Sequence, residues 1–164
     1  MTIVPTSAPA TTFLDLVNSI VWTDLTALLV SVNPNTNKEF IPTLHVEFTE
    51  DANGVLPAIQ LNCKVAAGMT AAYRTPWIVK DSIANVISVI DPVPLNVIGG
   101  QVNKSPHFGW QPPAPGIYLF QCEVRAYTPG GSSGSLVPQI GCHSALAAPA
   151  RVRVLPLSSI WHDG

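Results

Sequence analysis

The amino-acid sequence predicts an all-β protein in which two antiparallel sheets pack as a sandwich. About seven to nine short segments alternate between apolar and polar residues, and turn residues separate them roughly every 8–14 positions. Sixteen prolines and eleven glycines are spread along the 164 residues, which favours turns and strand edges over long helices. Hydrophobic residues make up 47% of the chain, which excludes disorder of the whole chain. No repeat or boundary divides it, so we expect one domain over residues 12–164.

Residues 1–11 consist mostly of Thr, Ser, Ala and Pro and predict an extended N-terminal arm. Two interpretations fit this segment: an arm that lies on a partner subunit, and a frayed terminus. The segment lacks the positively charged start and the compact apolar core of a signal peptide. We therefore expect synthesis in the cytoplasm of a host cell.

Residues 12–32 also fit two interpretations. Their apolar residues, from Phe13 to Leu29, fall on one broad face at helical spacing. The segment is equally rich in Val, Ile and Thr, which favour strands, and Asp24 would lie inside the apolar face of a helix. Two strands separated near Thr23-Asp24 are the favoured interpretation, because the rest of the chain has strand periodicity.

In the first half of the chain, two clearly alternating segments flank a turn sequence. Residues 44–49 alternate before the turn, and residues 59–65 alternate after it. Asn53-Gly54 between them is a strong hairpin signal, because both residue types accept a positive φ. The two segments are therefore expected to pair as a β-hairpin.

Residues 82–90 read Ser-Ile-Ala-Asn-Val-Ile-Ser-Val-Ile and are apolar on both strand phases except at Asn85 and Ser88. A strand covered on both faces has this pattern, and so has a strand at a subunit interface.

The clearest strand of the chain covers residues 117–126. A proline-rich approach from Trp110 ends at Gly116, and strict alternation begins at once. The inward residues of this strand are Tyr118, Phe120, Cys122, Val124 and Ala126. Further strands are predicted at residues 136–142, 144–148 and 151–155.

With Trp110 six residues before the glycine, the pattern Gly116-x-Tyr118-x-Phe120 resembles the signature of complement-type and tumour-necrosis-factor-like jelly rolls. The resemblance implies a jelly-roll sandwich that assembles as a compact homotrimer. It also implies that Trp110, Tyr118 and Phe120 pack in the core or at the threefold axis. The same architecture recurs, by resemblance, in head decoration (cement) proteins of tailed bacteriophages, which are poor in disulfides and catalytic groups.

The charge content restricts the possible partners. Only 11% of the residues are charged, against about 25% in typical soluble domains, so we expect neighbouring molecules to cover much of the surface. The net charge is -2 and no basic run occurs, which argues against nucleic-acid binding. No stretch reaches about 18 apolar residues, so no membrane span is expected.

The chain has three cysteines, Cys63, Cys122 and Cys142. The first two fall on the inward phase of predicted strands, where a thiol behaves as a small hydrophobic group. The odd count and the missing secretion signal predict reduced thiols, and a disulfide is the alternative.

The sequence offers no constellation of catalytic groups. His45 lies on the outward phase of a strand, and the adjacent pair Cys142-His143 lacks the spacing of zinc ligands. Residues 132–135 are serine-rich without the flanking pattern of a nucleophile elbow. Residues 47–51 place three carboxylates at a strand end, where solvated charges are common. We therefore expect no catalytic, cofactor-binding or metal-binding residues.

These observations lead to one expected function and two alternatives. The expected function is that of a non-enzymatic, trimeric decoration protein, which binds the major capsid protein on the outside of a phage capsid and resides in the virion. The first alternative is a receptor- or glycan-binding jelly-roll module, such as a fibre tip or a complement-like ligand. The second is a capsid protein that forms the shell itself, which the missing basic arm disfavours.

Overall fold

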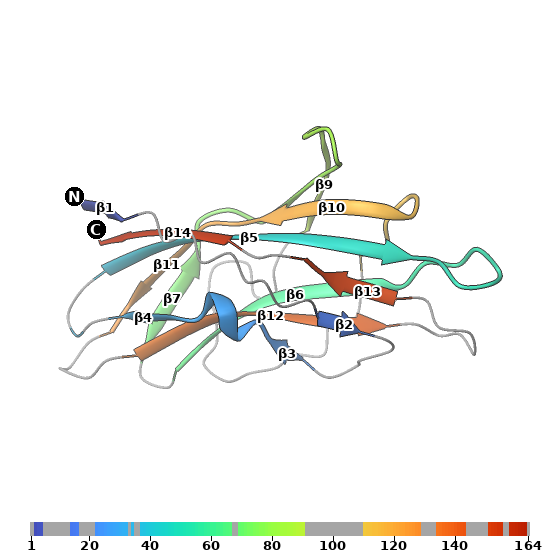
Figure 1. Cartoon of the computed structure of the whole chain (residues 1–164). Coiled ribbons are helices and arrows are strands. Elements are labelled where there is room, and N and C mark those ends of the chain that lie inside the picture. The colour runs from blue at the N-terminus through green and yellow to red at the C-terminus, as the bar shows by residue number, and fades with distance from the viewer. Residues whose placement is uncertain are drawn as a thin grey trace.

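The computed structural model describes residues 2–4, 14–16, 22–32, 34, 37–66, 69–90, 110–128, 134–143, 151–155 and 158–163 (Figure 1). Within these ranges the chain forms two antiparallel sheets that pack face to face, which confirms the predicted all-β sandwich. The one helical element among the described residues is a single 3-10 turn, η1 (Thr26–Leu28).

The first sheet has ten described strands and is organised around β5, which runs for thirteen residues. One edge of β5 pairs with β10 and then β11, and the other edge pairs with β13 and then β14. The strands of this sheet are β1 (Thr2–Val4), β2 (Leu14–Leu16), β5 (Asn37–Thr49), β7 (Thr70–Tyr73), β8 (Trp77–Lys80), β9 (Val86–Ile90), β10 (Gly116–Gln121), β11 (Val124–Tyr127), β13 (Arg151–Val154) and β14 (Ser158–Asp163).

The second sheet has four described strands and is organised around β12. One edge of β12 pairs with β6 over eight residues, and the other edge pairs with the short strands β3 and β4. The strands of this sheet are β3 (Thr23–Asp24), β4 (Val30–Val32), β6 (Ala58–Val65) and β12 (Gly134–His143).

The core lies between the two sheets and follows from the period of two along each strand. Every second residue of β5, from Lys38 to Phe48, is buried, and β6 shows the same alternation. Because successive side chains of a strand point to opposite faces, the apolar phase of each sheet faces the other sheet. The largest fully buried side chains are Trp77, Phe40, Phe48, Phe120, Leu25 and Leu28.

The predicted hairpin between residues 44–49 and 59–65 is wrong. The two segments belong to different sheets, since β5 pairs with strands of the first sheet and β6 pairs with β12. The reversal itself is present: the backbone N–H of Asp51 donates to the carbonyl of Val55 at 2.9 Å. The turn therefore carries the chain from one sheet to the other.

The prediction of one unbroken strand over residues 117–126 is also wrong, although its alternation is confirmed by the burial of every inward residue. The strand is divided into β10 and β11, with Cys122 and Glu123 between them. Both parts pair with β5 in one continuous register, and the gap lies opposite Pro42 and Ile41. Proline has no N–H, which accounts for the interrupted ladder at this point.

Within residues 12–32 the described part forms strands, as favoured, but their boundary differs. The 3-10 turn η1 separates β3 from β4, whereas Thr23-Asp24 is itself the strand β3. Of the expected arm, Thr2–Val4 forms β1 and pairs with β14, and residues 5–11 lie outside the described residues. The segment Ser158–Asp163, for which the sequence pattern predicts no strand, is the strand β14, paired with both β1 and β5.

The other predicted strands have mixed outcomes. Residues 136–142 lie within the longer strand β12, and residues 151–154 form β13. Residues 144–148 lie outside the described residues. Of residues 82–90, the second half forms β9 and the first half belongs to the turn that precedes it.

Candidate interaction surface

β8 and β9 form a hairpin at one side of the first sheet. The turn between them is built on Asp81, whose carboxylate Oδ1 accepts hydrogen bonds from the backbone N–H groups of Ile83 at 3.0 Å and Asn85 at 2.9 Å. The backbone N–H of Asp81 donates to the carbonyl of Asn85 at 2.9 Å. This closed turn fixes β9 beside β8, with Val89 opposite Ile78.

β9 is the outermost strand at its side of the first sheet and projects from the body of the sandwich (Figure 1). One of its backbone edges pairs with β8, and no described strand pairs with the other edge. Its apolar side chains are strongly exposed: Val86 is 59% exposed, Val89 54% and Ile87 39%, and Ile83 in the turn reaches 76%. The pairing shifts register between Val79 and Lys80, so Val86 and Val89 lie opposite Lys80 and Ile78 on the same outer face of the sheet. Ser88 and Ile90 of β9 are half-buried, so the exposed apolar side chains belong to the outer face.

Residues 82–90 contain no charged side chain and no proline. Edge strands of monomeric proteins are normally protected by charges, prolines or bulges, because an open edge recruits further strands. Of these devices, β9 has a shift of register opposite Val79 and Lys80. A group of exposed apolar side chains on such an edge is typical of a contact surface between proteins. We call this surface the β9 edge: the side chains of Ile83, Val86, Ile87 and Val89 together with the open backbone edge of the strand.

The β9 edge continues onto the outer face of the first sheet. Ile78 of β8 is half-buried and lies directly opposite Val89, so the two side chains share a face. On the adjacent strand β10, Leu119 is half-buried and Ile117 is exposed on the same outer face. Lys80 of β8 lies directly opposite both Val86 and Leu119, so a charged residue stands between the β9 edge and the apolar residues of β10.

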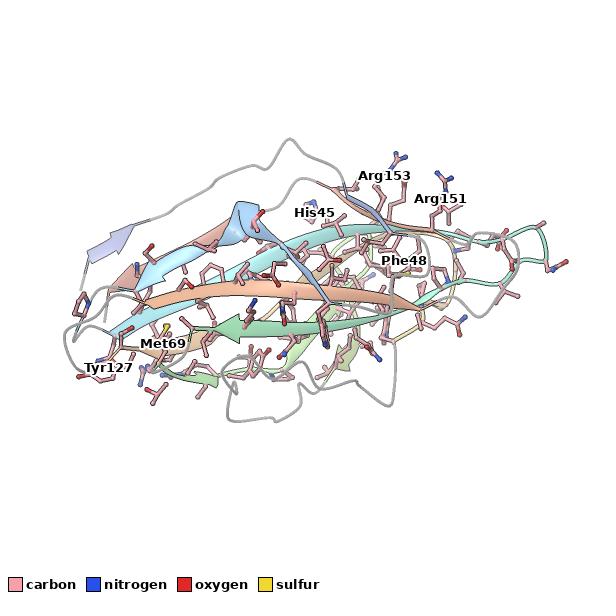
Figure 2. All side chains as sticks on the ribbon, turned by 90° about the horizontal axis from the view of Figure 1, so that it is seen from below. His45, Phe48, Met69, Tyr127, Arg151 and Arg153 are labelled. Atoms are coloured by element: carbon pink, nitrogen blue, oxygen red, sulfur yellow. The ribbon has the colours of Figure 1, made fainter. Side chains whose placement is uncertain are left out.

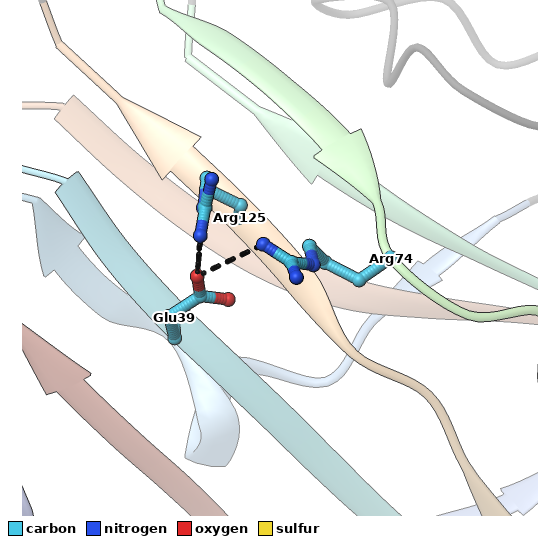
Figure 3. Close-up of polar contacts among 3 residues, drawn as sticks. All are labelled: Glu39, Arg74 and Arg125. Carbon is cyan, nitrogen blue, oxygen red and sulfur yellow. Dashed lines mark hydrogen bonds and ion pairs between the residues drawn. The ribbon is translucent and has the colours of Figure 1, made fainter. Parts of the chain in front are cut away.

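Elsewhere the outer face of the first sheet is charged. The Glu39 carboxylate accepts from Arg125 at 2.6 Å and is 3.5 Å from the guanidinium of Arg74, so one acid contacts two bases (Figure 3). Both arginines are about half-exposed, and water therefore screens these pairs to about 1 kcal/mol or less each. Arg153 points outward (Figure 2), with its guanidinium 4.0 Å from Glu47. Lys80 of β8 adds a further charged residue to this face, beside β9.

The three residues singled out from the sequence pattern lie together in one aromatic cluster around Phe48. The ring centroids of Trp110 and Phe120 are 5.3 Å apart and those of Trp110 and Tyr118 are 5.6 Å apart, with edge-to-face geometry in both pairs. Tyr118 and Phe120 are buried within the chain, and Trp110 is half-buried against them. Tyr118 and Phe120 therefore have almost no surface to offer to another subunit, and the position of a threefold axis stays a prediction.

Trp110 also connects the two sheets through its backbone. Its N–H donates to the carbonyl of Ile59 on β6 at 2.7 Å, and the N–H of Ile59 donates to the carbonyl of Trp110 at 2.8 Å. The Tyr118 hydroxyl donates to the carbonyl of Ala114 at 2.8 Å, which holds the proline-rich approach against β10. This arrangement is structural, and it places no reactive group at the cluster.

The chemical groups considered in the sequence are dispersed. His45 is exposed on the outer face of the first sheet, while His107 lies outside the described residues. The expectation of solvated carboxylates at residues 47–51 is wrong for Asp51, which is buried and accepts hydrogen bonds from the N–H groups of Asn53 and Val55. In the described part of the chain, no three His, Cys, Asp or Glu residues gather as a metal site would require.

Comparisons with known proteins give no family for this chain. No protein-family model and no curated protein sequence matches it. Among solved structures, it is weakly similar to a chain in the structure of the Gx strain of infectious bursal disease virus. The identity is 9% and the TM-score is 0.25, over 99% of this chain and 39% of that chain. A VP2 subviral particle of the same virus gives 8% identity and a TM-score of 0.24 over 99% and 42%. The chain thus spans about two fifths of these chains, and a likeness at this TM-score supports no conclusion about function.

In the described residues no helix has the length and hydropathy needed to cross a membrane.

Proposed function

We propose that this chain is a non-enzymatic structural protein of a virion, which assembles as a homotrimer through the β9 edge and decorates the outside of a phage capsid by binding its major capsid protein. The observation that carries the proposal is the β9 edge itself. A strand with exposed apolar side chains on its outer face and an open backbone edge is poorly suited to contact with water. Its burial against a neighbouring subunit would remove this exposed apolar area.

The geometry of a trimer requires two different surfaces on each subunit. In a closed ring of three, each contact is heterologous, so the β9 edge of one subunit meets another surface of the next. The apolar residues of the outer face, Ile117 and Leu119, are the described surface that best matches it in character. The low charge content of the whole chain, 11%, supports extensive contact with neighbours.

Binding of a trimer to a capsid is multivalent. A trimer presents three copies of any capsid-binding surface, so three modest contacts made together hold far more tightly than one. Losing the trimer should therefore also weaken attachment to the capsid, even where no capsid-binding residue is changed.

The test of assembly compares two lysine substitutions with a matched control. Val86→Lys combined with Val89→Lys places two charges on the outer face of β9, in the region that assembly would bury. Val55→Lys is the control, because Val55 is also an exposed valine, at 39%, but lies in the turn between β5 and β6. At micromolar concentration, light scattering coupled to gel filtration should give a trimer for the wild type and the control, and a monomer for the double variant. A monomeric wild type would contradict the proposal.

The test of decoration uses sedimentation with capsids from which decoration proteins have been removed. The wild-type trimer should co-sediment with these capsids, and the double variant should lose at least tenfold in binding. A wild type that fails to bind capsids but gives a signal on a glycan array would favour the receptor-binding alternative. Closed shells formed by the chain alone, seen by electron microscopy, would favour the shell-forming alternative.

A further inference from the structure

Two of the three thiols meet in the core between the sheets. Cys63 lies on β6 of the second sheet, and Cys122 lies in the interruption between β10 and β11 of the first sheet. Both are buried and free, and both lie beside Tyr73: Cys63 contacts its hydroxyl, and Cys122 lies two residues before Val124, the residue paired with Tyr73. The hydroxyl of Tyr73 adjoins them: it accepts a hydrogen bond from the backbone N–H of Cys63 at 2.8 Å and donates to Oδ1 of Asn62 at 3.0 Å.

The environment keeps the Cys122 thiol protonated. Burial, followed by the interaction with Cys63, raises the pKa of the Cys122 thiol well above its usual range. Burial likewise raises the pKa of the Tyr73 hydroxyl, and the two neighbouring cysteines add to the effect. Thiolate is the reactive form of cysteine, so the buried Cys122 thiol is inert while the core stays closed.

The third thiol is placed differently. Cys142 lies on β12 directly opposite Ile59, whereas Cys63 is opposite Pro138 of the same strand. Cys63 therefore lies four positions along β6 from Ile59, the residue opposite Cys142. This offset corresponds to roughly 13 Å along the strand. A disulfide needs Cα atoms within about 7 Å, so Cys63 and Cys142 cannot be joined without rearrangement of the sheet.

We propose that Cys63 and Cys122 form a latent disulfide that closes on oxidation and links the two sheets covalently. In this reaction two Sγ–H bonds break and one Sγ–Sγ bond forms. The two electrons and two protons pass to a small-molecule disulfide such as oxidised glutathione, which is reduced to two thiols, by way of a mixed disulfide. The position of Cys122 favours closure, because it lies in the gap where no ladder pairing to β5 is present among the described residues.

The consequence is a molecule whose stability depends on the redox state of its surroundings. A reducing cytoplasm holds the pair as thiols, and an oxidising medium outside the cell closes it. The bond would close a loop from residue 63 to residue 122 and restrict the unfolded chain. We expect it to raise Tm by roughly 5–15 °C. This inference rests on the fold alone and does not depend on the proposed function.

The experiment refolds the full chain from urea at about pH 8.5, once with oxidised glutathione and once with a reducing agent. Thiol titration in denaturant should find one remaining thiol after oxidation and three after reduction. Peptide mapping should then join the peptide of Cys63 to that of Cys122. Retention of all three thiols, a bond to Cys142, or cross-links only between chains would each overturn the proposal.

Two substitutions provide the matched comparison. Cys142→Ala removes the thiol outside the pair, so the oxidised variant should contain no free thiol and keep the full rise in Tm. Cys63→Ala removes one partner, so its Tm should be the same under both conditions. Should Cys63→Ala fail to fold, as far-UV circular dichroism would show, Cys122→Ala serves the same purpose from the other sheet. A redox-dependent Tm in these single-partner variants would overturn the proposal.

Discussion

Two turns of this molecule share the same hydrogen bonds, although they serve different purposes. In each, an aspartate carboxylate accepts from the backbone N–H groups two and four residues later: Asp51 at 2.8 and 2.9 Å, and Asp81 at 3.0 and 2.9 Å. In each, the fourth residue has a positive φ, 77° at Gly54 and 67° at Ala84. The turn at residues 51–55 joins the two sheets, whereas the turn at residues 81–85 closes a hairpin.

The difference shows that the turn sets the reversal and the neighbouring strands decide the pairing. At the end of β5, both backbone edges are already occupied, by β10 on one side and β13 on the other. The following strand therefore has no edge of β5 to join and pairs with β12 instead. β8 has β10 on one edge only, so β9 can pair with the other. A turn sequence alone does not contain this information.

The largest expected effect comes from the two aspartates. Asp51 is buried and Asp81 is partly exposed, so the N–H groups that lose their acceptor are harder for water to reach at Asp51. We expect Asp51→Ala to lower the free energy of unfolding by about 3 kcal/mol, and Asp81→Ala by about 1 kcal/mol. Urea unfolding measures both values. Asp51→Asn keeps one acceptor oxygen and should lose less than Asp51→Ala; equal losses at Asp51 and Asp81 would show that burial does not distinguish the turns.

The next effect concerns the residue with positive φ. Gly54→Ala should lower the free energy of unfolding by about 1 kcal/mol, because an L residue is strained in the left-handed region. Space is not limiting, since the nearest atom to an added Cβ would be Oε2 of Glu50 at 3.9 Å. The reciprocal change, Ala84→Gly, should raise the free energy of unfolding by about 0.5 kcal/mol. The reason is that relief of the backbone strain at the positive φ of Ala84 exceeds the entropy that glycine adds to the unfolded chain. Changes of the same sign at both positions would contradict this explanation.

The smallest effect is expected from exchanging the turn sequences. The quadruple change Ser82→Ala, Ile83→Asn, Ala84→Gly and Asn85→Val gives the hairpin the sequence of residues 51–55. If the flanking strands decide the pairing, β8 and β9 should remain paired and stability should change by no more than about 0.5 kcal/mol. Amide hydrogen exchange of Val79 and Ser88, which lie opposite each other in this hairpin, reports on the pairing directly. Loss of protection at these amides would show that the turn sequence determines which strands pair.

Much of the fold follows from alternation. The inward residues of β5, β6, β10 and β11 are identified by the period of two, and their burial confirms it. The pairing of strands does not follow, because an apolar phase fits any neighbour that completes the core. Three features therefore differ from expectation: the crossing at residues 51–55, the gap at Cys122–Glu123 and the strand at residues 158–163. The sequence shows Pro42, but it does not show that residues 122–123 lie opposite it, so the interruption could not be predicted.

The candidate surface is predicted less well than the fold. Residues 82–90 fit both a covered strand and an interface strand, and the structure exposes their apolar side chains at the margin of the sheet. The informative signal is the absence of charge and proline along these nine residues. Tyr118 and Phe120 attract attention because their pattern resembles a known signature, yet they lie inside the chain. An alternating pattern reports that a side chain is inward, and it does not report which molecule covers it.

The thirteen residues of β5 form one continuous strand, and shorter strands pair along each of its two edges. The interruptions between these shorter strands lie at different positions on the two edges. On one side the joint between β10 and β11 falls opposite Pro42 and Ile41, where β14 is intact on the other side. The joint between β13 and β14 falls near His45, where β10 is intact. A separation of strands that starts at either interruption therefore meets continuous pairing on the opposite edge of β5. Tension applied along β5 would be shared by the strands on both of its edges.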